Sequence, residues 1–99
     1  MSLVGVDTYV IDTLMGELVG HDRKPSALLV YLHLWLRTWG GRVRGVPASL
    51  QSVARGTGLS KSAVQAGMKI LFRRKLIRSM RRSPTGVPRY DVRRPWGGG

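Results

Sequence analysis

The chain contains no cysteine. This absence excludes disulfide bonds, thiolate metal sites and cysteine nucleophiles, and it agrees with a reducing cytoplasm. Long hydrophobic runs are also missing, because the longest, residues 27–36, is interrupted by His33 and is too short to span a bilayer. Residues 1–6 lack the basic start of a signal peptide, and Asp7 and Asp12 soon follow. We therefore expect a soluble, cytoplasmic protein that has no membrane partner.

Acidic residues are scarce. Five Asp and Glu stand against 17 Lys and Arg, a net charge of +12 in 99 residues. Four of the five acids lie within the first 22 residues, whereas residues 69–94 hold ten basic residues and one acid, Asp91. Such a charge attracts polyanions, and its concentration in the C-terminal third favours nucleic acid as the partner. The alternative is a basic solubilising or membrane-surface patch, which would normally mix both signs of charge.

No constellation of nucleophile, base and orienting group is visible, so we do not expect an enzyme. His21 and His33 are far apart and lack further ligands, and residues 56–58 lack the strand and lysine spacing of a phosphate-binding loop. No metal or cofactor is expected. Trp35 and Trp39 could line an effector pocket, although core packing is the commoner role for tryptophans at this spacing. No small-molecule effector is evident.

Periodicity predicts a mainly α protein with a small C-terminal β-hairpin. Apolar spacing indicates helices over residues 7–19 and 25–38, and the second should be the central core helix because it is apolar nearly all round. Residues 76–82 and 89–93 read as two strands around a Pro- and Gly-containing turn. Residues 42–47 are irregular or form one brief strand. We expect one domain over residues 1–96 and a flexible tail over 97–99.

Two short helices separated by a turn precede the hairpin. Ser49 can cap a helix over residues 50–55, and Ser60 can cap a longer helix that ends near Lys75. Gly58 lies where the turn between the helices requires a positive φ angle. Val64, Met68 and Leu71 follow at the spacing of a buried helical stripe.

Residues 49–77 resemble the winged helix-turn-helix of bacterial transcription regulators, and most closely the subgroup found in plasmid and phage replication initiators. The resemblance implies a three-helix core with an extra N-terminal helix and a basic wing, and it extends more loosely to Val92. It implies that the helix over residues 60–75 enters a major groove, while the wing over residues 78–93 lies on the DNA backbone or in the minor groove.

The resemblance also supplies candidate DNA contacts. Gln65 can bond adenine, Lys61 or Lys69 can reach guanine or phosphate, and Ala66 offers a methyl contact to thymine. Further candidates flank this face or lie on the wing and would mainly hold phosphates. The complete set of candidates is Arg55, Ser60, Lys61, Ser62, Gln65, Ala66, Lys69, Arg73, Arg74, Arg78, Arg81, Arg82 and Arg89.

The chain departs from the family pattern in three ways. Lys75 stands where glycine usually ends the helix, so we expect the helix to end differently. Gly67 replaces the usual alanine. Ile70 and Phe72 occupy positions that are commonly polar and are expected to pack against the N-terminal helix or a second subunit. The tail over residues 93–96 is expected either to fold back on the core or to contact DNA.

These observations predict a sequence-specific, nucleoid-associated protein that binds double-stranded DNA, a transcription regulator in the first place. A plasmid or phage replication or maintenance factor is hard to separate from it. A homodimer would bind a palindromic site. Two other classes stay open: a winged helix can serve as a protein-docking module, and RNA could be bound by its shape and phosphates.

Overall fold

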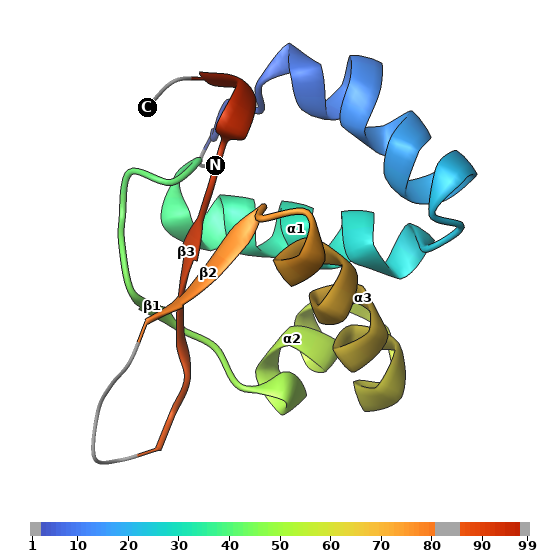
Figure 1. Cartoon of the computed structure of the whole chain (residues 1–99). Coiled ribbons are helices and arrows are strands. Elements are labelled where there is room, and N and C mark those ends of the chain that lie inside the picture. The colour runs from blue at the N-terminus through green and yellow to red at the C-terminus, as the bar shows by residue number, and fades with distance from the viewer. Residues whose placement is uncertain (1–2, 81–85, 98–99) are drawn as a thin grey trace.

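A small three-stranded antiparallel sheet packs beside a larger set of helices in the computed structural model, which describes residues 3–80 and 86–97 (Figure 1). The elements follow the order η1 (Val10–Leu14), η2 (Gly16–His21), α1 (Pro25–Thr38), β1 (Val46–Pro47), α2 (Leu50–Thr57), α3 (Lys61–Arg73), β2 (Ile77–Met80), β3 (Arg89–Val92) and η3 (Pro95–Gly97). The mainly α architecture with a C-terminal hairpin is therefore confirmed. None of the helices in the described ranges is long and apolar enough to cross a membrane.

The N-terminal helix differs from the expected α-helix. Its two parts, η1 and η2, have the wider π-type bonding, in which the backbone N–H of Asp22 donates to the carbonyl of Glu17, 2.8 Å away. Val10, Leu14 and Leu18 are buried, as the spacing predicts, but Ile11 is exposed. No side chain caps the start of η1, and the Asp7 carboxylate accepts instead from Arg94 and Trp96.

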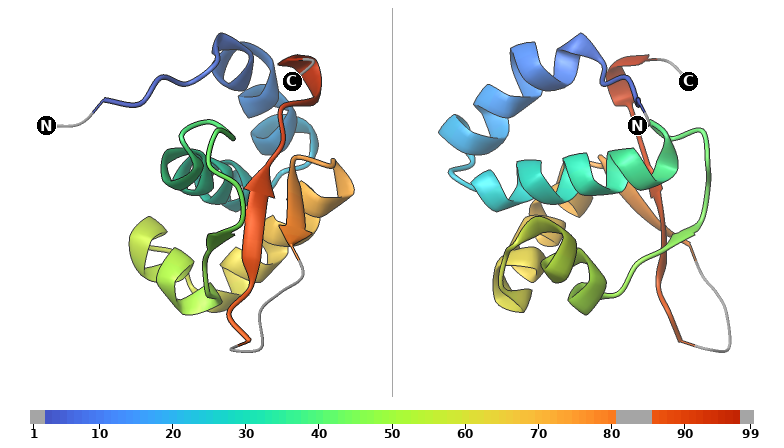
Figure 2. Two further views of the ribbon diagram at one scale, coloured as in Figure 1. Left: turned by 90° about the vertical axis from the view of Figure 1, so that its left-hand side faces the viewer. Right: turned by 180° about the vertical axis from the view of Figure 1, so that it is seen from behind.

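Helix α1 runs through the centre of the molecule, with α2 and α3 on one side and the N-terminal helix on another (Figures 1 and 2). Trp35 is 2% exposed, and its indole nitrogen donates to the carbonyl of Gly5. Trp39 adopts a left-handed conformation at the C-cap and is 51% exposed. The expectation that Trp39 packs in the core is therefore wrong. Helix α1 ends at Thr38, and the left-handed backbone of Trp39 leaves its side chain half exposed.

The two helices α2 and α3 and the turn between them form as their local signals predict. The Ser49 hydroxyl accepts from the Ser52 N–H, and the Ser52 hydroxyl accepts from the Ser49 N–H. This reciprocal pair caps the start of α2. Gly58 follows with φ of 80°, a conformation that glycine adopts without strain. The Ser60 hydroxyl then accepts from the Ala63 N–H and caps α3. The predicted inner stripe of α3, Val64, Met68 and Leu71, is buried.

Helix α3 ends with Lys75 in the left-handed region, at φ of 59°. The N–H of Lys75 donates to the carbonyl of Phe72, and the N–H of Leu76 donates to that of Leu71. This is the bond pattern of a Schellman motif, in which glycine usually takes the left-handed position. The expectation that lysine would force another helix end is wrong, because the fold retains the motif and lysine adopts the unfavourable conformation.

The sheet contains one strand more than the predicted hairpin. Strand β3 lies in the centre, with Ile77 of β2 opposite Val92 on one side and Val46 of β1 opposite Tyr90 on the other. The brief strand before α2 therefore closes the outer edge of β3. Figure 2 shows β3 starting towards the end of the molecule opposite η3.

The chain's last described residues fold back on the N-terminal helix. The rings of Tyr9 and Trp96 stack with centroids 4.4 Å apart. The Asp7 carboxylate accepts from Arg94 at 3.0 Å and from the Trp96 indole at 3.1 Å. The first of the two expectations for the tail is thus the one observed, and Gly97, predicted to be flexible, completes η3. Residues 98 and 99 of the predicted tail lie outside the described residues.

Candidate nucleic-acid interface

The outward face of α3 presents the polar residues that the sequence proposed for base readout. Lys61, Ser62, Gln65 and Lys69 are exposed. Ala66 is half-buried beside them. These side chains emerge at successive turns of one helix, so they lie along one face. The Ser60 oxygen is bonded to the start of α3 and therefore acts as a cap rather than as a free readout group.

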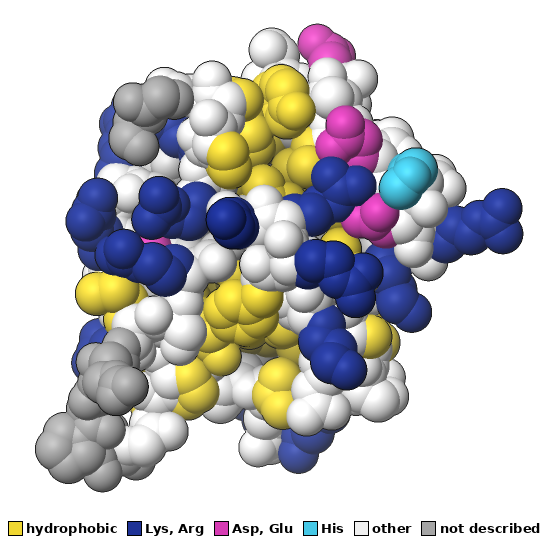
Figure 3. Space-filling view, in the orientation of Figure 1, with side chains coloured by type: hydrophobic (Ala, Val, Ile, Leu, Met, Phe, Trp, Pro, Cys, Tyr) yellow, Lys and Arg dark blue, Asp and Glu magenta, His cyan; other side chains and the backbone are white. Residues whose placement is uncertain are grey.

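An apolar hollow lies between this face and β3. Its volume is about 680 Å³, and Figure 3 shows hydrophobic side chains gathered in the middle of the molecule between α3 and the hairpin. Its lining comprises Leu50, Ser62, Gln65, Ala66, Met68, Lys69, Phe72, Pro88 and Tyr90. The candidate surface is thus polar along its rim and apolar within, which suits a methyl-bearing or otherwise apolar group.

Phe72 and Tyr90 form one wall of the hollow. Their ring centroids are 6.1 Å apart, and the ring of Phe72 is 40% exposed. Burial raises the pKa of the Tyr90 phenol above its ordinary value. Phe72 was expected to meet the N-terminal helix or a second subunit, but the structure pairs it with β3. Ile70 is buried in the core of the chain itself.

Arg74 was expected to hold phosphate, but the structure uses it inside the fold. Its Nε donates to Asp22 Oδ2 at 2.6 Å, and its Nη1 donates to Glu17 Oε1 at 2.8 Å. The Arg74 guanidinium, followed by His21, lowers the pKa of Asp22 to about 2. A DNA contact by Arg74 stays a prediction, although its donors already hold the carboxylates of η2 and its neighbouring turn. Arg55 and Arg73 remain exposed.

The wing candidates divide into three groups. Arg78 donates to Asp91, whose carboxylate is buried, yet half of the Arg78 side chain remains exposed. Arg89 is exposed and donates to the carbonyl of Gly45 at 2.8 Å. Arg81 and Arg82, like Pro84 and Thr85 at the predicted wing tip, lie outside the described residues.

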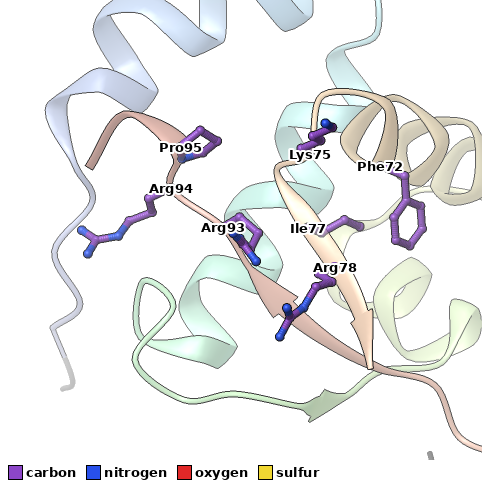
Figure 4. Close-up of a pocket in the computed structure, with 7 residues that line it drawn as sticks. All are labelled: Phe72, Lys75, Ile77, Arg78, Arg93, Arg94 and Pro95. Carbon is purple, nitrogen blue, oxygen red and sulfur yellow. The ribbon is translucent and has the colours of Figure 1, made fainter. Parts of the chain in front are cut away.

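Two exposed cations near the α3–β2 junction were not among the predicted site residues. Lys75 and Arg93 line a cleft of about 430 Å³ together with Arg78 and Arg94 (Figure 4). We call this the cationic cleft; its remaining lining residues are Phe72, Ile77 and Pro95. The concentration of basic residues between positions 69 and 94 was the available signal, but only the fold brings residues 75 and 93 together.

Other kinds of site have less support within residues 3–80 and 86–97. No group of three or more His, Asp or Glu side chains there could hold a metal ion. Trp35 and Trp39 both line a hollow of about 310 Å³ next to the N-terminal segment. Its volume is smaller than that of the hollow beside α3. Trp35 is also buried in the core of the chain.

Comparison with known proteins yields no match to any family model, curated protein or solved structure. The function must therefore be argued from the geometry and charge of the chain itself.

Proposed function

We propose that this chain is a winged helix-turn-helix protein that binds double-stranded DNA sequence-specifically and regulates transcription. The observation that carries the proposal is the outward face of α3, where Lys61, Gln65 and Lys69 are exposed. Side-chain caps at Ser49 and Ser60 fix the starts of α2 and α3 on either side of the turn. This arrangement suits insertion of α3 into a major groove. The excess of positive charge supplies attraction to phosphates, and a nucleoid-associated, cytoplasmic location would follow.

In this proposal the two kinds of contact come from different parts of the surface. Gln65 would read adenine through its amide, and Lys61 or Lys69 would reach guanine. Arg55, Arg73 and Arg89 would hold backbone phosphates and fix the register of α3. The apolar hollow beside Ala66 would accept the methyl group of thymine, which is the only apolar group on a base edge in the major groove.

Selection from a randomised duplex library at two salt concentrations tests the proposal. We expect an enriched motif, and we expect Gln65→Ala to relax the preference at one position of that motif by about 1–3 kcal/mol. Gln51→Ala is the matched control, because Gln51 is an exposed glutamine on α2 outside the α3 face. Weak binding to all sequences that disappears with salt would overturn the proposal.

Two alternatives remain. A plasmid or phage replication or maintenance factor would use the same face in the same way, so an enriched motif would fit it equally well. A protein-docking module is favoured by the apolar hollow, which a hydrophobic side chain of a partner would fill equally well. That module would give no enriched duplex, and its binding would resist salt.

A homodimer remains part of the proposal, and the helices opposite the sheet offer a surface for it. Ile11 and Val19 on the N-terminal helix and Leu29 and Leu36 on α1 are exposed apolar residues. The two helices pack together (Figure 2). Two chains of charge +12 repel each other, and this segment holds four of the five acids, so repulsion is weakest there. Sedimentation of the parent chain and of Leu29→Gln/Leu36→Gln would show whether a dimer forms and depends on this face.

A further inference from the structure

The cationic cleft collects positive charge from three separate parts of the chain. Lys75 comes from the end of α3, Arg78 from β2, and Arg93 and Arg94 follow β3 (Figure 4). Its floor and walls include the apolar side chains of Ile77, Phe72 and Pro95. Like charges brought together destabilise the compact state through mutual repulsion. Internal carboxylates or an external anion would relieve this repulsion.

Internal carboxylates neutralise only part of the cleft. Arg78 is paired with Asp91 at 3.1 Å, and Arg94 with Asp7 at 3.0 Å. Asp91 is 4% exposed and also accepts from the N–H of Gly45, so it has little capacity left. All five acids of the chain lie in the described residues, and none forms an ion pair with Lys75 or Arg93. Within residues 3–80 and 86–97, Lys75 and Arg93 are therefore exposed positive charges that no carboxylate side chain neutralises.

The backbone at Lys75 provides a second, independent observation. Its φ of 59° places a residue with a Cβ in the left-handed position that glycine occupies at lower cost. The motif at the end of α3 would form as well or better with glycine. The helix end therefore does not require a lysine side chain, and the side chain that stands there lines the cleft.

We propose that the cationic cleft binds phosphate groups and, resting on the proposed function, that these belong to the DNA backbone flanking the segment read by α3. Phe72 lines both the cleft and the apolar hollow, so the two surfaces adjoin. A duplex whose bases face the hollow would carry its next backbone phosphates past Lys75 and Arg93. The sheet side of the molecule would thus extend the footprint beyond α3.

The test compares Lys75→Gly with Arg23→Gly. Arg23 is exposed, is also left-handed with φ of 55°, and is not among the residues that line the cleft. Both variants remove one positive charge and relieve the same kind of strain, so both should keep or raise the melting temperature. Only Lys75→Gly should weaken binding to a long duplex, by roughly two- to fivefold, and lower the salt slope by about one unit.

The outcomes separate the cleft from the general proposal. Equal duplex binding by Lys75→Gly and Arg23→Gly overturns the cleft while DNA binding stands. If the parent chain binds no duplex, DNA binding fails, and titration with inorganic tripolyphosphate decides the cleft. If tripolyphosphate binds saturably to the parent chain and to Arg23→Gly but not to Lys75→Gly, the cleft binds free phosphates. Equal or unsaturable binding overturns it.

Discussion

Arg74 Nε lies 2.6 Å from Asp22 Oδ2, which ties the last turn of α3 to the end of the N-terminal helix. Glu17 accepts from the same guanidinium at 2.8 Å. The pairing places one arginine of the basic run in a structural role, whereas its neighbour Arg73 remains exposed. Adjacent residues of the same type therefore serve different purposes.

Substitution of these neighbours should separate stability from binding. Arg74→Ala leaves Glu17 without this donor and Asp22 with His21 alone, and it should lower the free energy of unfolding by about 1 kcal/mol. It should reduce duplex affinity only as far as one unit of net charge requires. Arg73→Ala should do the opposite, with stability almost unchanged and the salt slope lowered by about one unit. Urea denaturation and salt-dependent affinity measure both. Equal effects of the two variants would contradict the division of roles.

The Arg74–Asp22 pair should also make stability depend on acid pH. Its guanidinium lowers the pKa of Asp22 from 3.8 to about 2 in the folded chain. The unfolded state therefore binds the proton more readily, so the pair stabilises the fold above about pH 4 and this contribution is lost as the pH falls towards 2. Melting temperatures of the parent and Asp22→Asn should differ at pH 5 and converge near pH 2. A constant difference across that range would contradict the assignment.

Gly67 allows α3 to approach α1 closely. A Cβ added at Gly67 would lie 3.1 Å from backbone atoms of Ser26 and Ala27, where no side chain can rotate away. Gly67→Ala gains about 1 kcal/mol of helix propensity, but overpacking costs roughly 1–3 kcal/mol. We expect net destabilisation, and a larger loss for Gly67→Val, in urea denaturation. Stabilisation by alanine would show that the two helices can separate without cost.

Trp96 should contribute to stability through its contacts with Tyr9 and Asp7. Trp96→Ala removes a stacked ring and an indole donor, and we expect a loss of roughly 1–2 kcal/mol. Trp39→Ala is the matched control, because Trp39 is half exposed. Thermal unfolding of the two variants measures the difference. Equal losses would mean that the tail contributes nothing beyond ordinary apolar contact.

The sequence predicts the α2–turn–α3 unit well because its signals act over a few residues. Ser49 and Ser60 each bond an N–H three residues ahead, and Gly58 meets a local demand on φ. Charge composition also locates the basic part of the chain. Neither signal reaches across the fold, so the partners of Arg74, 52 and 57 residues away, could not be predicted.

Other differences arise where packing competes with local preference. Trp39, rather than Gly40, ends α1, and Lys75 adopts a conformation that favours glycine. The cationic cleft depends on strand register, which sets Ile77 against Val92 and so brings Lys75 and Arg93 to one end of the sheet. Periodicity indicates that strands exist but does not give their pairing.

Asp7 accepts hydrogen bonds from Arg94 and Trp96. In the sequence these partners lie 87 and 89 positions after Asp7. Closing so long a loop has a large entropic cost, and such contacts form after the local ones. We therefore expect the N-terminal helix to open as a unit while α2 and α3 stay folded, so that its amide protons exchange with solvent first. The N-terminal segment, which carries most of the acids, would then detach while the basic remainder of the protein stays folded.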